Sequence, residues 1–157
     1  MQAFSFPYQQ SLKHQLPEGQ QRLVAAAQAA AQKAYAPYSL FKVGAAVLLS
    51  GGNIMTGSNH ENASLPAGIC AERAVLASIP MDEAHKISAI AIAYLPPADT
   101  EHHPPLSPCG ICRQTILEAQ QFQQAPIQVF MSSPDGTIIM VEDASFLLPF
   151  HFGKEFL

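Results

Sequence analysis

The segment ISAIAIAYL, residues 87–95, decides how this chain folds. It is a nearly continuous apolar run, without the strict alternation of apolar and polar residues that marks a half-buried strand. Strands of this kind are covered on both faces, as in the sheets of α/β proteins. We therefore expect residues 87–95 to form a strand inside a sheet that has helices on both sides.

The segments on either side supply further strands. Apolar, β-branched runs separated by turn sequences predict two pairs of strands, one before and one after the central segment. The predicted strands cover residues 42–50, 54–59, 126–133 and 137–142. The sequences GGN at 51–53 and PDG at 134–136 are typical of tight turns, so each pair is expected to form a hairpin.

Helical patterns lie between the predicted strands. The predicted helices cover residues 18–35, 69–79 and 109–122. The first places Leu23, Val24, Ala27 and Ala31 on one side, as expected of a helix that packs on a sheet. In the third, Ser107 is a plausible N-cap, with Pro108 in the first turn.

The order of these elements predicts an α/β fold, with about five strands and helices on both faces of the sheet. We expect one domain over residues 1–157, with residues 1–16 as an irregular N-terminal arm. The proline-rich stretch 96–108 is interpreted as a long loop, because neither side of it has enough elements to close a core by itself.

Composition narrows the class of partner. The net charge is −4, and the eight Lys and Arg residues are scattered, which argues against a surface that follows a nucleic acid polymer. No apolar run is long enough to cross a membrane, and the N-terminus lacks the pattern of a signal peptide. Three cysteines are an odd number for a disulfide framework, so we expect a reducing, cytoplasmic setting.

The three cysteines are the main candidates for metal ligands. Cys70 lies at the start of one predicted helix, and Cys109 and Cys112 lie at the start of another, three residues apart. Helix N-termini lower thiol pKa values, and zinc favours thiolates in tetrahedral geometry. Three protein ligands leave the fourth position for water, which is the arrangement of a catalytic zinc site, and a His filling that position is the alternative.

Two charged residues follow Cys70 directly. Glu72 is close enough to accept a proton from a zinc-bound water and pass it on. Zinc with three thiolates carries a net negative charge, and Arg73 is a candidate to offset it by donating hydrogen bonds to sulfur.

These motifs resemble a known family. Zinc deaminases carry a His-x-Glu motif followed by Pro-Cys-x-x-Cys. Here the corresponding residues are Cys70-Ala71-Glu72 and Pro108-Cys109-Gly110-Ile111-Cys112, with Cys in place of His. This variant resembles the cytidine deaminases that act on free nucleosides. Further stretches are similar to that family in the same order, and the resemblance covers roughly residues 18–152. They are YAPYSLFKVGAAV, GSNHENAS, PAGICAERAV, SPCGICRQ and LLPFHF.

The resemblance implies a three-layer α/β/α sandwich with a mixed sheet, and one zinc ion per chain. It assigns the zinc ligands to Cys70, Cys109 and Cys112, and the proton shuttle to Glu72. The implied reaction is hydrolytic deamination of cytidine or deoxycytidine to the uracil nucleoside, in pyrimidine salvage.

The same resemblance implies the contacts to the substrate. Asn59 and Glu61 match a pair that hydrogen-bonds the ribose 3′-hydroxyl, and Phe41 matches an aromatic residue that packs on the pyrimidine. The backbone of Ala71 matches a contact to the base. Phe152 matches a C-terminal aromatic residue that reaches a neighbouring subunit's site, and family members with three Cys ligands are typically homotetramers.

Several alternatives stay open. Leu40 and Leu65 depart from the family's usual polar residue and Tyr, which leaves room for another aminopyrimidine or a nucleoside antibiotic as substrate. A non-catalytic zinc protein and a redox protein using Cys109 and Cys112 are further alternatives. Asn59 would otherwise be a turn residue, and Phe41 or Phe152 a core residue. The adjacent His102 and His103 are interpreted as part of a solvated loop.

Overall fold

The computed structural model describes residues 2–96 and 103–157. Its centre is a mixed sheet of six strands in the order β1-β6-β5-β4-β2-β3, in which only β4 and β5 pair in parallel. The strands are β1 (Gln9–Leu12), β2 (Lys42–Leu49), β3 (Ile54–Ser58), β4 (Ile87–Leu95), β5 (Gln128–Ser132) and β6 (Thr137–Val141). The helices are α1 (Glu18–Ala31), α2 (Ala71–Leu76) and α3 (Gly110–Gln123). In the described part of the chain, no helix is both long and apolar enough to cross a membrane.

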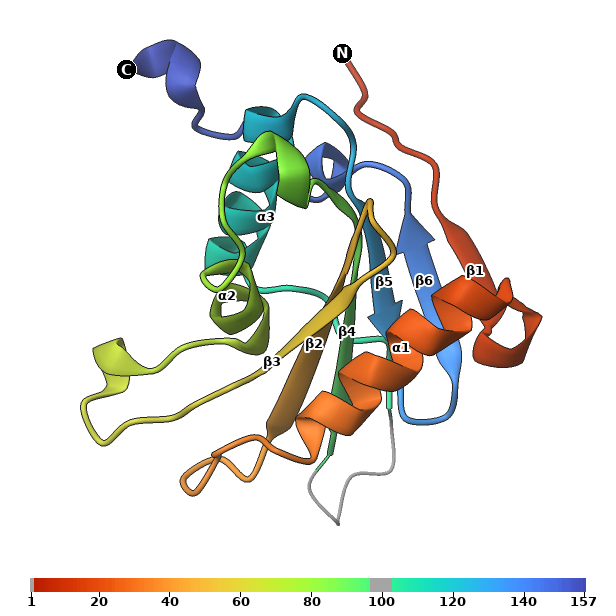
Figure 1. Cartoon of the computed structure of the whole chain (residues 1–157), viewed down its shortest axis with the longest axis vertical. Helices are drawn as coiled ribbons and strands as arrows, with labels where there is room; N and C mark the ends of the chain where they lie inside the picture. The colour runs from red at the N-terminus through yellow and green to blue at the C-terminus, as the bar shows by residue number, and fades with distance from the viewer. Residues whose placement is uncertain (1, 97–102) are drawn as a thin grey trace.

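The central position of residues 87–95 is confirmed. Strand β4 lies between β2 and β5, and α1 covers one face of the sheet while α2 and α3 cover the other (Figure 1). Ile90 and Ile92 pack into the core beside α2 and α3, and Ala89, Ala91 and Ala93 pack beneath α1. The small alanine side chains on one face allow α1 to lie close to the sheet.

The predicted apolar side of the first helix is also confirmed. Leu23, Val24, Ala27 and Ala31 are all buried, and the first three belong to the core layer beneath α1. The approach is closest at Gly44 of β2, where an added Cβ would stand 2.1 Å from the carbonyl oxygen of Ala27. The helix ends at Ala31, four residues earlier than predicted.

The expectation of an irregular N-terminal arm and about five strands was wrong in one respect. Residues 9–12 form β1, which pairs antiparallel with β6 and adds a sixth strand at that edge of the sheet. The sequence QQSL carries no apolar alternation, and its side chains are mostly exposed. The strand therefore depends on backbone pairing, for which the side chains give no signal.

The third helix also begins later than predicted. Its N-cap is Cys109 and its first residue is Gly110, so Ser107 does not cap it and Pro108 lies before its first turn. The Ser107 hydroxyl instead contacts the Met131 sulfur at 3.3 Å. Part of the proline-rich loop, residues 97–102 with His102, lies outside the described residues.

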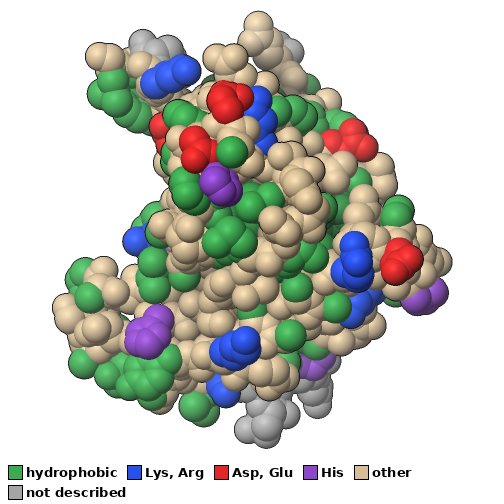
Figure 2. All heavy atoms as spheres, in the orientation of Figure 1, with side chains coloured by type: hydrophobic (Ala, Val, Ile, Leu, Met, Phe, Trp, Pro, Cys, Tyr) green, Lys and Arg blue, Asp and Glu red, His purple; other side chains and the backbone are tan. Residues whose placement is uncertain are grey.

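Charged side chains of both signs are scattered over the face shown in Figure 2, without a continuous basic stripe. This agrees with the net charge of −4.

Candidate metal centre and substrate pocket

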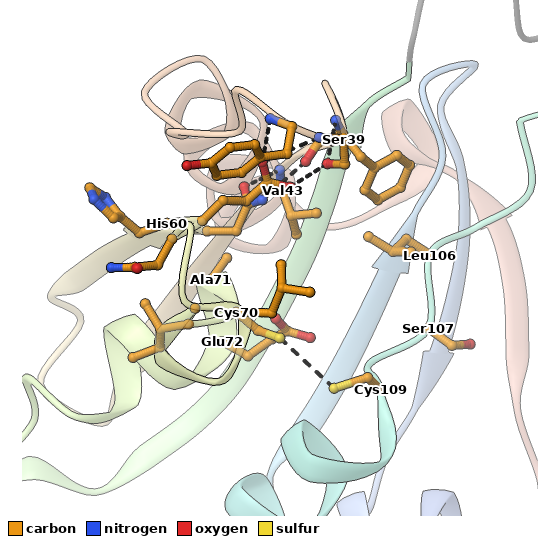
Figure 3. Close-up of a pocket in the computed structure, with 17 residues that line it drawn as sticks. Ser39, Val43, His60, Cys70, Ala71, Glu72, Leu106, Ser107 and Cys109 are labelled. Carbon is orange, nitrogen blue, oxygen red and sulfur yellow. Dashed lines mark hydrogen bonds between the residues drawn. The ribbon is translucent and has the colours of Figure 1, made fainter.

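Helices α2 and α3 begin next to each other at the floor of a cavity of about 680 Å³ (Figure 3). The walls come from three segments that are distant in sequence: residues 38–43, 59–72 and 106–109. Gly57 on β3 permits α2 to pack close to the sheet, because an added Cβ would stand 2.7 Å from the Val75 nitrogen. The sheet thus sets the position of the helix that follows Cys70.

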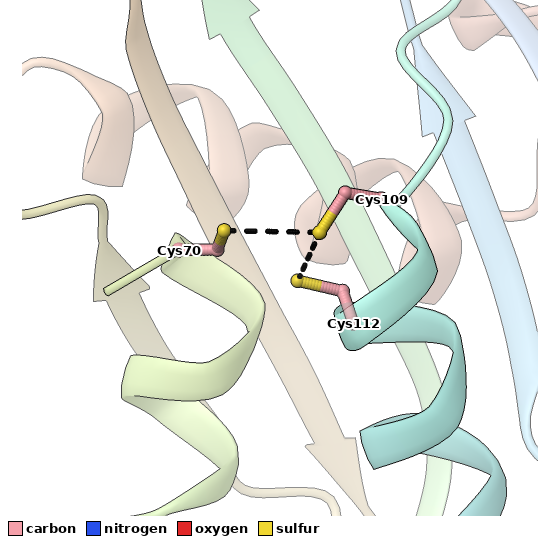
Figure 4. A group of neighbouring side chains, drawn as sticks. All are labelled: Cys70, Cys109 and Cys112. Atoms are coloured by element: carbon pink, nitrogen blue, oxygen red, sulfur yellow. Dashed lines mark hydrogen bonds between the residues drawn. The ribbon is translucent and has the colours of Figure 1, made fainter. Parts of the chain in front are cut away.

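The three cysteines converge at the two helix starts (Figure 4). Cys70 and Cys109 are the N-cap residues of α2 and α3, and Cys112 lies in the first turn of α3. The Sγ atoms of Cys70 and Cys109 are 3.9 Å apart, and those of Cys109 and Cys112 are 3.4 Å apart. All three lie within 4.8 Å of one another.

This donor set fits one zinc ion. Tetrahedral zinc with Zn–S bonds of about 2.3 Å places its sulfur ligands about 3.8 Å apart, close to the spacing of the three Sγ atoms. Cys109 is exposed, Cys70 is half-buried and Cys112 is buried, so the cluster opens toward the cavity on one side. Three ligands and one open side match a site that keeps a position for water or substrate.

The surroundings of the thiols favour a cation. Burial raises the pKa of Cys70 and of Cys112, and the nearby Glu72 carboxylate adds to both shifts. Burial also acts to raise the pKa of Cys109, but hydrogen bonds from the Cys112 backbone and from the other two thiols lower it overall. The repulsion among these groups is what a bound divalent cation would relieve.

Glu72 is the buried acid of the site. It lies in the first turn of α2, is only 4% exposed, and lines the cavity beside Cys70. Burial raises the pKa of its carboxyl, while its own backbone N–H and the Cys112 thiol offset part of that effect. A carboxyl with a raised pKa can both accept and return a proton near neutral pH.

Glu61 lies on the opposite wall and is held by the loop before β2. One carboxylate oxygen accepts a hydrogen bond from the Ser39 hydroxyl, and the other accepts from the backbone nitrogens of Tyr38, at 2.9 Å, and Ser39, at 3.3 Å. The Ser39 hydroxyl bond is the main reason that the pKa of Glu61 lies below its ordinary value. Glu61 is therefore an oriented carboxylate.

Asn59 is fixed by the backbone of the same wall. Its Oδ1 accepts from the Val43 nitrogen at 2.8 Å, and its Nδ2 donates to the Phe41 carbonyl at 3.0 Å. The amide retains one N–H and one lone pair for a ligand. Phe41 lines the cavity and also stacks on Tyr94, with the ring centroids 5.1 Å apart.

The other residues singled out in the sequence occupy different positions. Ala71 is buried and lines the cavity. Arg73 lines a separate groove between α2 and α3, and within the described part of the chain it makes no hydrogen bond to a thiol. Phe152 is 59% exposed and lies outside the cavity, where it stacks on Phe156.

Two contributing residues were missed in the sequence. Ser39 orients Glu61 through a hydrogen bond from its hydroxyl. Arg113 fixes the segment that precedes Cys109, because it donates hydrogen bonds to the carbonyls of Pro108, at 2.8 Å, and Leu147, at 3.1 Å. Arg113 immediately follows Cys112, and that adjacency was the only available signal. Figure 3 shows the Ser107 hydroxyl turned away from the cavity, whereas Leu106 points into it.

Fold and site together define an α/β/α protein with a cluster of three thiols whose spacing fits one zinc ion. Residues 17–127 match the family model described as the cytidine and deoxycytidylate deaminase zinc-binding region. A cytidine deaminase from Sporosarcina psychrophila is 39% identical over 135 residues, covering 86% of this chain and 92% of that protein. The chain therefore belongs to the cytidine and deoxycytidylate deaminase family.

Solved structures agree with this assignment. The crystal structure of a cytidine deaminase from Burkholderia pseudomallei matches with a TM-score of 0.69 at 38% identity, covering 83% of this chain and 97% of that one. A cytidine deaminase from Mycobacterium tuberculosis matches with a TM-score of 0.62 at 34% identity, covering 84% of this chain and 95% of that one.

Proposed function

We propose that this chain catalyses the hydrolytic, zinc-dependent deamination of cytidine and deoxycytidine to uridine and deoxyuridine, in pyrimidine salvage. The observation that carries this proposal is the buried Glu72 carboxyl beside three converging thiols at the floor of one cavity. A purely structural zinc site is closed by four ligands and needs no buried acid.

In this proposal Cys70, Cys109 and Cys112 hold the zinc ion. Zinc, when bound there, lowers the pKa of a coordinated water towards neutrality. Glu72 takes up a proton from the attacking water and delivers it to the ring nitrogen beside the amino-bearing carbon of cytosine. It then moves a second proton to the amino group, which leaves as ammonia. One water is consumed for each ammonia released.

The opposite wall supports recognition of a nucleoside. The carboxylate of Glu61 and the amide of Asn59 are oriented by the loop before β2, and both line the cavity. We assign them to the ribose 3′-hydroxyl, Phe41 to the face of the pyrimidine and the Ala71 backbone to the base. None of the described residues that line the cavity is Lys or Arg, which supports a neutral nucleoside over a phosphorylated one.

The assembly proposed for this chain is a homotetramer in the cytoplasm. Phe152 supports such an assembly, because it lies outside its own cavity and leaves an aromatic ring exposed at the surface, where a neighbouring subunit is proposed to bind. Arg73 is proposed to offset the negative charge of the zinc centre by its own charge, because in the described part of the chain it donates no hydrogen bond to a thiol.

The first test is conversion of cytidine, deoxycytidine and free cytosine by zinc-loaded protein, followed by ultraviolet absorbance. We expect both nucleosides to be converted and the free base to react far more slowly, because the base alone leaves Asn59 and Glu61 without a partner. Failure to convert either nucleoside, in protein that holds one zinc per chain, would contradict the proposed substrate. The exposed Leu65 at the rim of the cavity would then direct the search to other aminopyrimidine nucleosides.

A further inference from the structure

We propose that the N-terminal arm, residues 2–12, is a strap that holds the segment leading into Cys109 and so controls how firmly the thiol cluster retains zinc. This inference rests on the ligand set proposed above. Four observations support it: the pairing of the arm with the sheet, an aromatic contact, two hydrogen bonds from one arginine, and a cavity that the arm shares with the metal-bearing loop. The metal-bearing loop is defined here as residues 106–109, which lead into Cys109.

The arm is anchored at the outer edge of the sheet. Strand β1 pairs with β6 from Gln9 opposite Met140 to Leu12 opposite Thr137, and the Lys13 nitrogen continues the ladder to the Gly136 carbonyl at 2.9 Å. In Figure 1 the arm runs upward from the Gln9 end of β1, beyond the edge of the sheet. The ladder therefore fixes where the residues before β1 lie.

Those residues are aromatic and contact the turn that follows β6. The ring of Phe6 stacks on Phe146, with centroids 5.8 Å apart and an interplanar angle of 22°. Phe6 is 38% exposed, so more than half of its side chain is covered. Phe146 belongs to the short helix η4 (Ala144–Leu147), which therefore packs against the arm on one side and the core on the other.

A single arginine joins η4 to the metal-bearing loop. The Arg113 Nη1 donates to the carbonyl of Leu147, the last residue of η4, and its Nε donates to the carbonyl of Pro108. Pro108 directly precedes Cys109. Hydrogen bonds from a charged donor are among the stronger ones, so a shift of η4 is transmitted to the peptide that positions the Cys109 sulfur.

The arm and the loop also face each other across one cavity of about 430 Å³. Phe4, Phe6 and Tyr8 line one side, and Ser107 and Arg113 line the other. Ser107 also lines the substrate cavity, so the segment 106–109 is a thin wall between the two. Besides Arg113, hydrogen bonds to β5 hold this wall, at Leu106 and at Ser107. If the arm detaches, the segment 106–109 loses contacts on the side that faces away from the substrate cavity.

The experiment is zinc release from the full-length, zinc-loaded chain to a chromogenic chelator, which does not depend on turnover. For Phe6→Ala we expect release about threefold to tenfold faster, the range that the loss of one aromatic pair corresponds to. Phe6→Leu keeps an apolar side chain at this position and should give an intermediate rate. The matched control is Phe150→Ala, because Phe150 is 99% exposed and should leave the rate unchanged.

A double-mutant cycle tests the path through the arginine. Arg113→Gln should accelerate release about tenfold or more, as loss of a group that orients a metal ligand does. If the arm acts through Arg113, adding Phe6→Ala to Arg113→Gln has little further effect. Multiplicative effects in the double variant would overturn the proposed path.

Two further results would also overturn the inference. The first is a folded Phe6→Ala or Phe6→Leu protein that releases zinc at the wild-type rate. The second is wild-type protein that binds no zinc, which would reject the proposed ligand set itself. If Phe6→Ala fails to fold, Phe6→Leu and a cycle of Phe6→Leu with Arg113→Gln decide the question.

Discussion

The Glu72 carboxyl combines two properties that an ordinary helix residue does not have. It is almost completely buried, and it lies beside a cluster of three thiols. Burial of an acid without a basic partner destabilises the folded state, so its presence here indicates a chemical task. For Glu72→Gln we expect retained zinc and a loss of turnover of at least about a hundredfold, the usual contribution of a general acid–base group.

Zinc content by atomic absorption and the rate of cytidine conversion check this prediction. Glu118→Gln is the matched control, since Glu118 is exposed on α3 and should leave both quantities unchanged. Normal turnover in Glu72→Gln would contradict the assignment of Glu72 as proton shuttle.

Ser39 is the residue that contributes most to lowering the pKa of Glu61. The Ser39 hydroxyl bond is the largest cause of the lowered pKa of Glu61, and it is lost in Ser39→Ala. We expect the pKa of Glu61 to rise toward its ordinary value of 4.5 in this variant. A carboxyl whose pKa is lower in the folded state stabilises the fold above the unfolded-state pKa, and this stability is lost as pH falls through the folded-state pKa. In Ser39→Ala we therefore expect the free energy of unfolding to decrease less steeply as pH is lowered.

A carbon-detected NMR titration of the Glu61 carboxyl measures this shift. Ser39→Thr retains the hydroxyl and should keep the pKa low, which separates the hydrogen bond from a general effect of changing the loop. An unchanged pKa in Ser39→Ala would show that the backbone donors alone hold the carboxylate.

Leu40 adopts a backbone conformation that is unfavourable for leucine. Its φ is 59°, in the left-handed region, and its side chain is 64% exposed, so little packing compensates for the strain. Asn tolerates this region better. We expect Leu40→Asn to increase the free energy of unfolding by about 0.5–1 kcal/mol in urea titrations.

The control for Leu40→Asn is Leu65→Asn. Leu65 is 80% exposed and does not have a positive φ, so the same chemical change there should not stabilise the protein. Equal stabilisation of both variants would mean that removing an exposed leucine, and not backbone strain, is responsible.

Among single residues, those with unusual side-chain chemistry could be predicted from the sequence. Cysteines at helix starts with an adjacent acid are recognisable from their spacing alone. Ser39 and Arg113 were not recognisable, because Ser39 meets Glu61 only through the fold and Arg113 binds the backbone carbonyls of Pro108 and Leu147. Because every residue has the same backbone carbonyl, the sequence does not indicate which carbonyls accept these hydrogen bonds.

Among the elements, helix α2 depends on the absence of a side chain at Gly57. An added Cβ would stand 2.7 Å from the Val75 nitrogen and 2.8 Å from the Ala71 carbonyl oxygen, and both are backbone atoms of α2 that cannot rotate away. We expect Gly57→Ala to lower the free energy of unfolding by about 1–3 kcal/mol, as overpacking does. It should also weaken zinc binding, because α2 follows Cys70 directly.

Urea unfolding and zinc titration measure the two effects of Gly57→Ala. Gly51→Ala is the control, because a Cβ there meets nothing within 4 Å. If Gly57→Ala binds zinc as tightly as the wild type, the position of α2 does not depend on this contact.

Helices and strands were predictable where the pattern of apolar side chains indicates which face is buried. Strand β4 was recognised because both of its faces are apolar, and α1 because its buried side recurs with helical spacing. Strand β1 was missed because its pairing with β6 uses backbone groups only. The start of α3 was misplaced because the Ser107 hydroxyl contacts Met131, a residue brought near by the sheet.

For the whole molecule, the thiol cluster joins two parts of the chain that lie far apart in the sequence. Cys70 follows the β2–β3 hairpin, and Cys109 and Cys112 follow β4 and its long loop. A metal ion bound to all three therefore closes a long loop and stabilises the folded state by its binding free energy. Sequence spacing predicts such a ligand set, but only the packing of α2 beside α3 brings the sulfurs to the distances that zinc requires.

Zinc removal should consequently lower the stability of the entire fold. At free zinc about a hundredfold above its Kd, binding contributes about 2.7 kcal/mol, which corresponds to a rise in Tm of about 5–10 °C for a chain of this size. Differential scanning calorimetry of the wild type with zinc and with a chelator measures this difference. Cys109→Ala should melt at the same temperature in both conditions, whereas the Ser107→Ala protein, altered two residues away, should still respond to zinc. A wild-type Tm that does not change with zinc would mean that the cluster does not hold the metal in the folded state, because a ligand that binds the native chain must raise its Tm.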